Sequence, residues 1–165
     1  MKTLVLCRHA KSDWPEGIRD FDRPLKNRGE KDAARLGKLL YSHGFMPDLM
    51  VSSPANRAIS TASIVQAELQ FTQQIIQHAS IYHEGTGSLL NLIDQLPLES
   101  DTVMIFGHNP TMEDTVRSLL RMNSPFQMPT AGMVCLESYS PDWQQFRKHF
   151  LHLRWMQIPR LQRKN

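Results

Sequence analysis

The sequence predicts an α/β fold, a three-layer αβα sandwich with a mainly parallel central sheet. Along the chain, short apolar segments of strand character alternate with longer segments whose apolar residues recur at helical spacing. The segment at 101–107 is a continuous apolar run between polar ends, which is typical of a parallel strand buried on both faces. Together these patterns indicate helices on both sides of one sheet.

Six segments have the composition of strands. Helical segments separate the first four, as parallel strands require, whereas a Ser-Pro-Asp turn at 140–142 joins the last two into an expected hairpin that completes the sheet. The charged stretch at 11–26 contains prolines and glycine, which predicts an irregular loop after the first strand. The strands are expected at 2–7, 48–52, 75–82, 101–107, 131–139 and 146–155.

Helix-start and helix-stop residues mark the segments between the strands. Asn27 with Glu30 resembles a capping box, and Gly44 is placed to end the same helix. Ser53-Pro54 is typical of an N-cap followed by the first helical position. Helices are therefore expected at 27–42, from 53 to about 69, at 86–96, and from 109 to about 120.

Composition limits the classes of protein to which this chain can belong. With 165 residues, 41% hydrophobic and 21% charged, it is expected to form one domain over 1–165 with a sizeable core. The apolar runs are too short to cross a bilayer and no signal-peptide core is evident, so we expect a cytoplasmic protein without a membrane partner. Cys7 and Cys135 are too few for a disulfide framework and are expected to be buried thiols.

The chain is mildly basic, with a net charge of +3 and a pI near 9.0. Much of the surplus lies at 160–165, where we expect a solvated terminus rather than a surface that binds nucleic acid. A basic balance would also suit an anionic substrate such as a phosphate.

Three of the predicted strands deliver polar side chains to one edge of the sheet. The first ends in Arg8-His9, the second leads to Arg57 one turn inside the next helix, and another ends at His108. Because open α/β folds bind ligands at the carboxyl edge of the sheet, we expect these side chains to be neighbours in a site. A lone histidine at a strand end is more often structural, but crowding two arginines with two histidines is costly unless they share an anion.

These residue types indicate phosphoryl chemistry. Two guanidinium groups can bind phosphate oxygens in bidentate fashion, and helix N-termini after Ser53 and at the Asn109 backbone would add N–H donors. A neutral His9 can attack phosphorus to form a phosphohistidine that water hydrolyses, while His108 donates to the equatorial oxygens. No step needs a metal or another cofactor, and no Asp/His cluster has metal-ligand spacing.

Four ordered motifs extend this pattern: Leu6-Cys7-Arg8-His9-Ala10-Lys11-Ser12, Arg23-Pro24-Leu25 with Arg28-Gly29, Ser52-Ser53-Pro54 with Arg57-Ala58 and Thr61-Ala62, and Gly107-His108-Asn109-Pro110. They resemble the histidine phosphatase superfamily, which has the phosphoglycerate-mutase-like fold, and more closely its SixA-type phosphohistidine phosphatases. The resemblance implies that His9 is the nucleophile and that Arg8, Arg57 and His108 bind the phosphoryl group. Ala10 stands where much of the superfamily has glycine, which we interpret as the mark of a subgroup.

The acid that would protonate a leaving group is left open. Phosphomonoesterases and mutases of the superfamily usually take a carboxylic acid from the loop after the third strand, and here that loop holds His83 and Glu84. Each is a candidate acid or substrate contact, or an ordinary surface residue, and Lys11 and Arg23 are likewise substrate contacts or solvated loop charges. An imidazole leaving group, with a pKa of ~6.5, needs less help than a water-like group with a pKa of ~15.7.

The expected activity is that of a metal-independent phosphatase, acting on phosphohistidine in a signalling protein. The alternative is a small-molecule phosphomonoesterase of the same fold, which would use His83 or Glu84 as its acid. A phosphate-binding module without activity is the non-enzyme alternative, against which the complete set of Arg8, His9, Arg57 and His108 argues. The expected partner is a phosphorylated protein or a small phosphorylated metabolite, with the chain itself a monomer or weak dimer.

Overall fold

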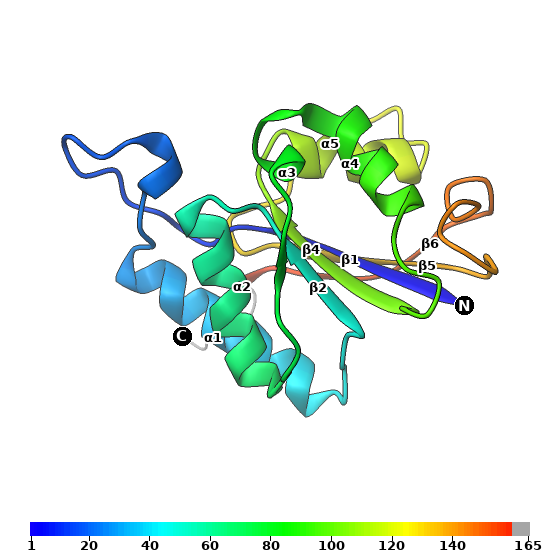
Figure 1. Cartoon of the computed structure of the whole chain (residues 1–165), viewed down its shortest axis with the longest axis horizontal. Coiled ribbons are helices and arrows are strands. Elements are labelled where there is room, and N and C mark those ends of the chain that lie inside the picture. The colour runs from blue at the N-terminus through cyan, green and yellow to red at the C-terminus, as the bar shows by residue number, and fades with distance from the viewer. Residues whose placement is uncertain (160–165) are drawn as a thin grey trace.

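A computed structural model of the chain describes residues 1–159, which form one six-stranded sheet between two layers of helices (Figure 1). The first four strands of the sequence run parallel. At one side of the sheet, the fifth strand pairs antiparallel with the first, and the sixth pairs antiparallel with the fifth. Across the sheet the order is β3 (Ile76–Gln77), β2 (Leu49–Ser52), β4 (Thr102–Gly107), β1 (Lys2–Arg8), β5 (Met133–Ser138) and β6 (His152–Gln157).

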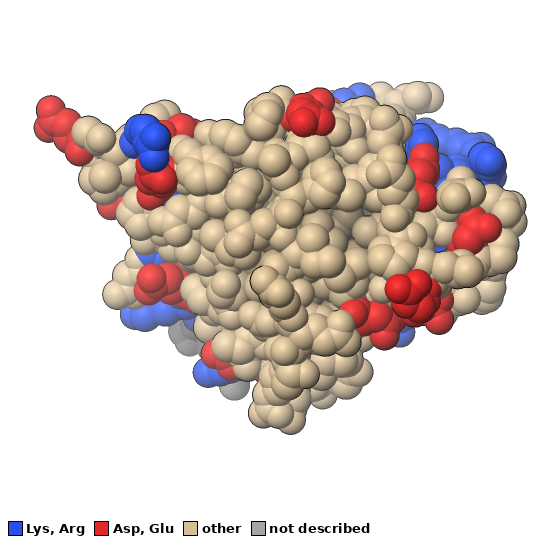
Figure 2. All heavy atoms as spheres, in the orientation of Figure 1, with Lys and Arg blue, Asp and Glu red and all other residues tan. Residues whose placement is uncertain are grey.

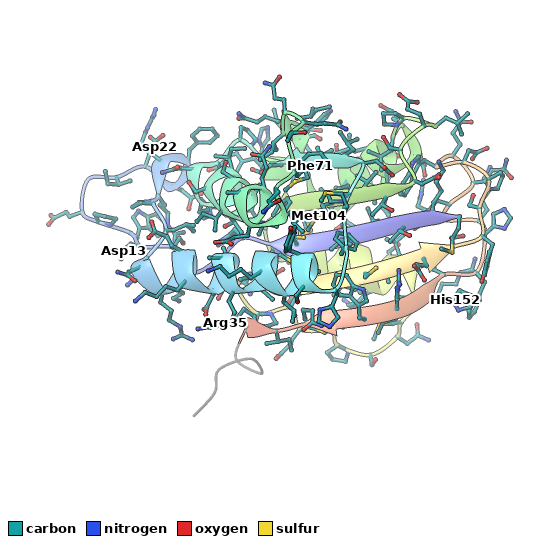
Figure 3. The ribbon with its side chains drawn as sticks, turned by 90° about the horizontal axis from the view of Figure 1, so that it is seen from below. Asp13, Asp22, Arg35, Phe71, Met104 and His152 are labelled. Carbon is teal, nitrogen blue, oxygen red and sulfur yellow. The ribbon has the colours of Figure 1, made fainter. Side chains whose placement is uncertain are left out.

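Helices cover both faces of this sheet. Figures 1 and 3 show, from two directions, that a layer of helices lies on each face of the sheet. The predicted mainly parallel three-layer fold is thereby confirmed. The first pair is α1 (Asn27–Ser42) with α2 (Asn56–Leu69), and the second layer holds α3 (Ser80–His83), α4 (Gly85–Asp94) and α5 (Thr111–Leu119).

Alternation along β1 sends its side chains into two separate cores. Leu4 and Leu6 join the core with α4 and α5, whereas Val5 and Cys7 join the core with α1 and α2. All four are fully buried, as expected for a central strand covered on both faces. Cys135 lies in the same core as Cys7, and burial raises the pKa of both thiols, so both serve packing rather than nucleophilic chemistry.

The carboxyl ends of β1, β4 and β2 lie side by side. Arg8 is opposite Gly107 in the register of β1 with β4, and Ser52 of β2 is opposite Phe106 of β4. A Cβ atom at Gly107 would meet the terminal methyl group of Met112, so any larger residue there would force that side chain to shift. The residues that follow these three strands therefore leave the sheet from the same edge.

The structure contradicts several local predictions. Asn27 does not cap its helix, since α1 has Lys26 as its N-cap and no side-chain hydrogen bond there. The strand expected at 75–82 shrinks to β3, whose two residues are exposed at the sheet edge, where no neighbour favours a longer strand. Pro54 does not begin a helix, since α2 starts at Asn56 with Ala55 as its N-cap. The last two strands are joined by a long irregular connection rather than a tight turn, because Trp143 and Phe146 pack into the core between them.

The loop between β1 and α1 projects from the molecule as an arm, defined here as residues 12–25. A backbone bridge between its first and last residues closes the arm at its base. Gly29 lets α1 approach that base, because a Cβ atom there would collide with the backbone oxygen of Lys11. Figure 1 shows the arm, with its 3-10 turn η1 (Asp20–Asp22), beyond the edge at which β1, β2 and β4 end.

Charged side chains lie mainly around the rim of the face seen in Figure 2, and the arm carries charges of both signs. Within residues 1–159, no helix is both long and apolar enough to span a membrane. The basic segment at 160–165 lies outside the described residues.

Candidate active site

His9 follows the last residue of β1 and is held by its backbone on two sides. Its N–H donates to the Gly107 oxygen over 3.0 Å, and its oxygen accepts from the Ala131 N–H over 3.1 Å. The residue is only 9% exposed. The strand ends on either side of β1 thus fix the position of the imidazole.

A hydrogen bond to its own neighbour sets the tautomer of His9. Nδ1 lies 2.8 Å from the Ala10 backbone oxygen, which can only accept, so Nδ1 carries the proton and Nε2 keeps its lone pair. Burial lowers the pKa of His9 to about 4. The hydrogen bond to Ala10 acts to raise this pKa, whereas the charges of Arg57 and Arg8 lower it further. At neutral pH His9 is therefore an uncharged imidazole with a nucleophilic Nε2.

His108 follows β4 and lies beside His9, with 5.2 Å between the ring centroids. The Ser53 hydroxyl oxygen accepts from the Ala55 N–H over 3.3 Å and lies 2.8 Å from His108 Nε2, so its own proton is free to be donated to Nε2. Burial lowers the pKa of His108 to about 3, with His9 and Arg57 acting in the same direction. With the Ser53 proton donated to Nε2, the proton of the neutral ring lies on Nδ1, a buried atom without a hydrogen-bond partner among the described residues.

Both arginines are oriented by the protein through their terminal nitrogens. Arg57, in the first turn of α2, donates from Nη1 to the Asp20 backbone oxygen over 2.6 Å and from Nη2 to Asp20 Oδ2 over 3.0 Å. Arg8 donates from Nη1 to the Met128 oxygen over 2.7 Å. Within residues 1–159, the Nε of each arginine is buried and has no partner, so each keeps a donor for a bound group.

Asp20 connects the arm to this cluster. Besides Arg57, its carboxylate accepts from Arg23 Nη1 over 3.1 Å and from the Tyr82 hydroxyl over 2.8 Å. Burial acts to raise the pKa of Asp20, but the hydrogen bonds from Tyr82 and Arg23 and the charge of Arg57 outweigh it and lower the pKa to about 2. Asp20 is therefore ionised at neutral pH. Tyr82 also packs edge-on against His108, with 5.7 Å between ring centroids.

Three of the buried nitrogens that lack a partner belong to this cluster: Arg8 Nε, Arg57 Nε and His108 Nδ1. Leaving buried donors unpaired is costly, and the two guanidinium charges repel each other. An anion with several acceptor oxygens would satisfy both the donors and the charges. A phosphoryl group is such an anion, and it would present its phosphorus to His9 Nε2.

The structure thus brings together the four residues that the sequence singled out first, Arg8, His9, Arg57 and His108, whose roles stay predictions. It does not bring His83 or Glu84 to them by any contact that the described residues show. His83 is exposed and packs its ring against Tyr82, and Glu84 accepts a hydrogen bond from Ser88 at the start of α4 over 2.7 Å.

Two of the remaining candidates, Asn109 and Arg23, have structural partners. The Asn109 side chain donates to Glu113 over 2.6 Å and to the Met128 oxygen over 3.1 Å, which secures the turn after β4. Arg23 donates to Ser12 over 2.7 Å as well as to Asp20, so it braces the arm next to the cluster. Lys11 is exposed at the base of the arm.

Asp20 and Tyr82 are the members of the cluster that sequence reasoning missed. Asp20 stands in a charged loop beside Asp13 and Asp22, and no local pattern distinguishes it from them. Tyr82 stands in a segment whose composition indicated a strand. Only the folding of the arm over α2 and α3 shows which acidic residue meets Arg57.

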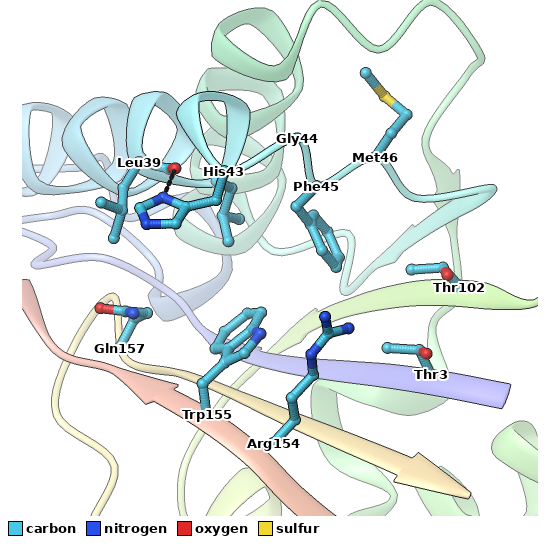
Figure 4. A pocket seen from close by; sticks show the side chains of 11 residues that line it. Thr3, Leu39, His43, Gly44, Phe45, Met46, Thr102, Arg154, Trp155 and Gln157 are labelled. Carbon is cyan, nitrogen blue, oxygen red and sulfur yellow. Dashed lines mark hydrogen bonds between the residues drawn. The ribbon is translucent and has the colours of Figure 1, made fainter. Parts of the chain in front are cut away.

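One hollow on the described part of the molecule lies away from this cluster. It has a volume of about 430 Å³ and lies between the end of α1 and β6, at the opposite end of β1 (Figure 4). Phe45, Trp155 and Arg154 line it, and Arg154 is paired with Glu137 at 2.7 Å. A second hollow, of about 450 Å³, adjoins Arg8 and is lined by Glu113 and the segment around Met128.

Comparison with known proteins agrees with this geometry. Residues 4–81 match the model of the histidine phosphatase superfamily (branch 1). The fold superposes with a TM-score of 0.82 on a candidate phosphohistidine phosphatase SixA from Agrobacterium tumefaciens, at 29% identity over 96% of this chain and 98% of that chain. The chain therefore resembles the histidine phosphatase superfamily in sequence over residues 4–81, and the SixA structure in fold over nearly its whole length.

A second structure of this kind, from Nakamurella multipartitia, has a TM-score of 0.84 at 25% identity and covers 96% of both chains. The superfamily resemblance drawn from Arg8-His9 and the later motifs is thereby confirmed. The likeness to these SixA structures supports phosphatase, and hence hydrolase, activity for this protein.

Curated relatives extend the comparison. An uncharacterized chloroplastic protein of Arabidopsis thaliana is 29% identical over 154 residues, which are 87% of this chain and 70% of that protein. A 2,3-bisphosphoglycerate-dependent phosphoglycerate mutase of Nocardia farcinica is 42% identical over 66 residues, 38% of this chain and 26% of the mutase. The matched segment is thus only about a quarter of the mutase.

Proposed function

We propose that this protein removes phosphoryl groups from phosphohistidine, by transfer to His9 and hydrolysis of the resulting phosphoenzyme. The observation that carries the proposal is the group of unpaired buried donors around an uncharged His9 whose Nε2 is free. Those donors match the oxygens of a phosphoryl group, and the free lone pair matches its phosphorus.

In the first step, the Nε2 lone pair of His9 forms a bond to phosphorus as the bond from phosphorus to the substrate imidazole breaks. The other ring nitrogen of the substrate carries a proton, so that neutral imidazole leaves with the bonding pair. Arg8 and Arg57 neutralise the oxygens, and His108 Nδ1–H donates to them as charge spreads in the transition state. In the second step, water attacks the phosphoenzyme, the bond from phosphorus to Nε2 breaks, and inorganic phosphate leaves. His9 returns to its starting form, in which Nδ1–H still donates a hydrogen bond to the Ala10 oxygen.

The surroundings of the cluster favour a leaving group that needs no strong acid. The acidic side chain in contact with Arg57 is Asp20, whose pKa of about 2 keeps it without a proton to give. Glu84 is turned to Ser88. An imidazole whose second ring nitrogen carries a proton leaves as a neutral group, with a pKa of ~6.5, whereas a water-like group with a pKa of ~15.7 needs a proton from an acid of the enzyme. Phosphohistidine therefore suits this site better than an alkyl phosphate.

The first prediction compares three substrates of the purified protein. Histidine-phosphorylated protein and an aryl phosphate, which both have good leaving groups, are expected to be turned over, and phosphoserine is expected to react at least about 100-fold more slowly in kcat/KM. Release of inorganic phosphate measures all three. Equal turnover of phosphoserine would favour the phosphomonoesterase alternative, and no turnover of any substrate would leave only a phosphate-binding module.

The second prediction concerns Asp20 as a positioning residue for Arg57. Asp20→Ala is expected to lower kcat about tenfold or more, because Arg57 keeps the backbone oxygen of residue 20 but loses the carboxylate that also orients it, and small misplacements are costly in catalysis. Asp20→Glu should restore part of the loss. The KM for an aryl phosphate should rise less than the kcat falls, since removing a carboxylate also removes repulsion of the substrate anion. Equal kcat for Asp20→Ala and wild type would refute the positioning role.

A further inference from the structure

The arm carries exposed apolar side chains next to the candidate active site. Trp14 is 60% exposed, Ile18 38% and Phe21 37%. All three come from one stretch of eight residues that folds back on itself, with Gly17 at a φ of +78° at its tip. Exposed large apolar groups that gather in this way commonly mark a surface for a protein partner.

The arm is held in a defined position relative to His9. Phe21 packs edge-on against Tyr82 at 5.3 Å, and Tyr82 packs against His108. The arm is also tied to α2, because the Asn56 side chain donates to the Asp22 oxygen over 3.1 Å next to the pairing of Asp20 with Arg57. A surface organised before binding costs little ordering when a partner docks.

Trp14 and Arg23 connect the apolar surface to the cationic cluster. The Arg23 guanidinium lies 4.4 Å from the Trp14 ring centroid and also binds Asp20. The Trp14 indole N–H donates to the Ile18 oxygen over 3.0 Å, which keeps the ring on the arm. One continuous surface therefore runs from the arginines, which attract an anion, to uncharged side chains that project beyond them.

We propose that the arm, through Trp14, Ile18 and Phe21, is the docking surface for the folded protein that presents a phosphohistidine to His9. Charge complementarity places the dianionic phosphoryl group between Arg8 and Arg57, and the protein around that phosphohistidine then lies over the arm. A small phosphorylated metabolite would fill the cationic cluster without reaching Ile18. The inference rests on the proposed function and adds to it the part of the chain that recognises the substrate as a protein.

The test compares a protein substrate with a small one in the full-length chain. The variants are Ile18→Ser and the double variant Trp14→Ser/Ile18→Ser. Leu98→Ser is the control, because Leu98 is 65% exposed and precedes β4, at the end of the sheet where the parallel strands begin. The substrates are free phosphohistidine and the best substrate from a panel of proteins phosphorylated on histidine with phosphoramidate.

We expect the double variant to lose at least about tenfold in kcat/KM for the phosphoprotein, mostly through KM, while its kcat/KM for free phosphohistidine stays within about threefold of wild type. Leu98→Ser should match wild type with both substrates. Unchanged phosphoprotein turnover in the double variant, or equal losses with both substrates, would overturn the docking role. If wild type turns over neither substrate, the proposed function itself fails, which is a distinct outcome.

Discussion

His9→Ala is expected to abolish turnover, with a loss in kcat of at least about 10⁴-fold, and to leave no covalent phosphoenzyme. The physical reason is that His9 supplies the Nε2 lone pair beside the unpaired nitrogens of Arg8, Arg57 and His108. His108 cannot replace it, since its Nε2 accepts from Ser53 and its Nδ1 carries the proton. Rapid quenching with ³²P-labelled phosphoprotein measures the intermediate directly.

The pH dependence of phosphoenzyme formation gives this prediction a second readout. Protonation of His9 removes the Nε2 lone pair, and burial lowers its pKa to about 4. The rate in wild type should therefore hold from about pH 8 to about pH 5 and fall only as the pH approaches 4, rather than near the ordinary histidine pKa of ~6.5. A phosphoenzyme that persists in a folded His9→Ala variant would contradict the assignment of the nucleophile.

Arg57→Ala is the second large expected effect, with kcat/KM lowered by about 10² to 10³-fold. Arg57 supplies a buried charge and an unpaired Nε beside His9, and both would be lost. Arg57→Lys should fall between alanine and wild type, because lysine keeps the charge but not the planar set of donors. Steady-state kinetics with an aryl phosphate and calorimetric titration with inorganic phosphate measure catalysis and binding separately.

The matched control is Arg154→Ala, which removes an exposed arginine on β6 that pairs with Glu137 away from the cluster. It should leave kcat/KM within about twofold of wild type. Thermal unfolding should show that the Arg57→Ala variant is folded, since Asp20 keeps Arg23 and Tyr82 as partners. If kcat/KM for folded Arg57→Ala stays within about threefold of wild type, Arg57 does not bind the phosphoryl group.

Much of the architecture could be predicted because it depends on burial along each segment. The continuous apolar run of β4 and the helical spacing in α1 reflect which sides of these elements lie in the core. The end of each apolar run also indicates where a strand ends, so the sequence was enough to place Arg8-His9 and His108 at one edge of the sheet. The β3 region was predicted wrongly, because its length depends on a neighbour at the sheet edge rather than on its own composition.

The layered fold, the resemblance to the histidine phosphatase superfamily and the four residues at the centre of the candidate site follow from the sequence alone. The tertiary arrangement is needed to see which ring nitrogen of His9 carries the proton and which acidic residue pairs with Arg57. Ser53 reaches His108 across 55 positions of sequence, and Asp20 reaches Arg57 across 37 and Tyr82 across 62. Hydrogen bonds of 2.6 to 3.0 Å form only when packing aligns donor and acceptor closely, and hydrophobic periodicity carries no information on such alignment.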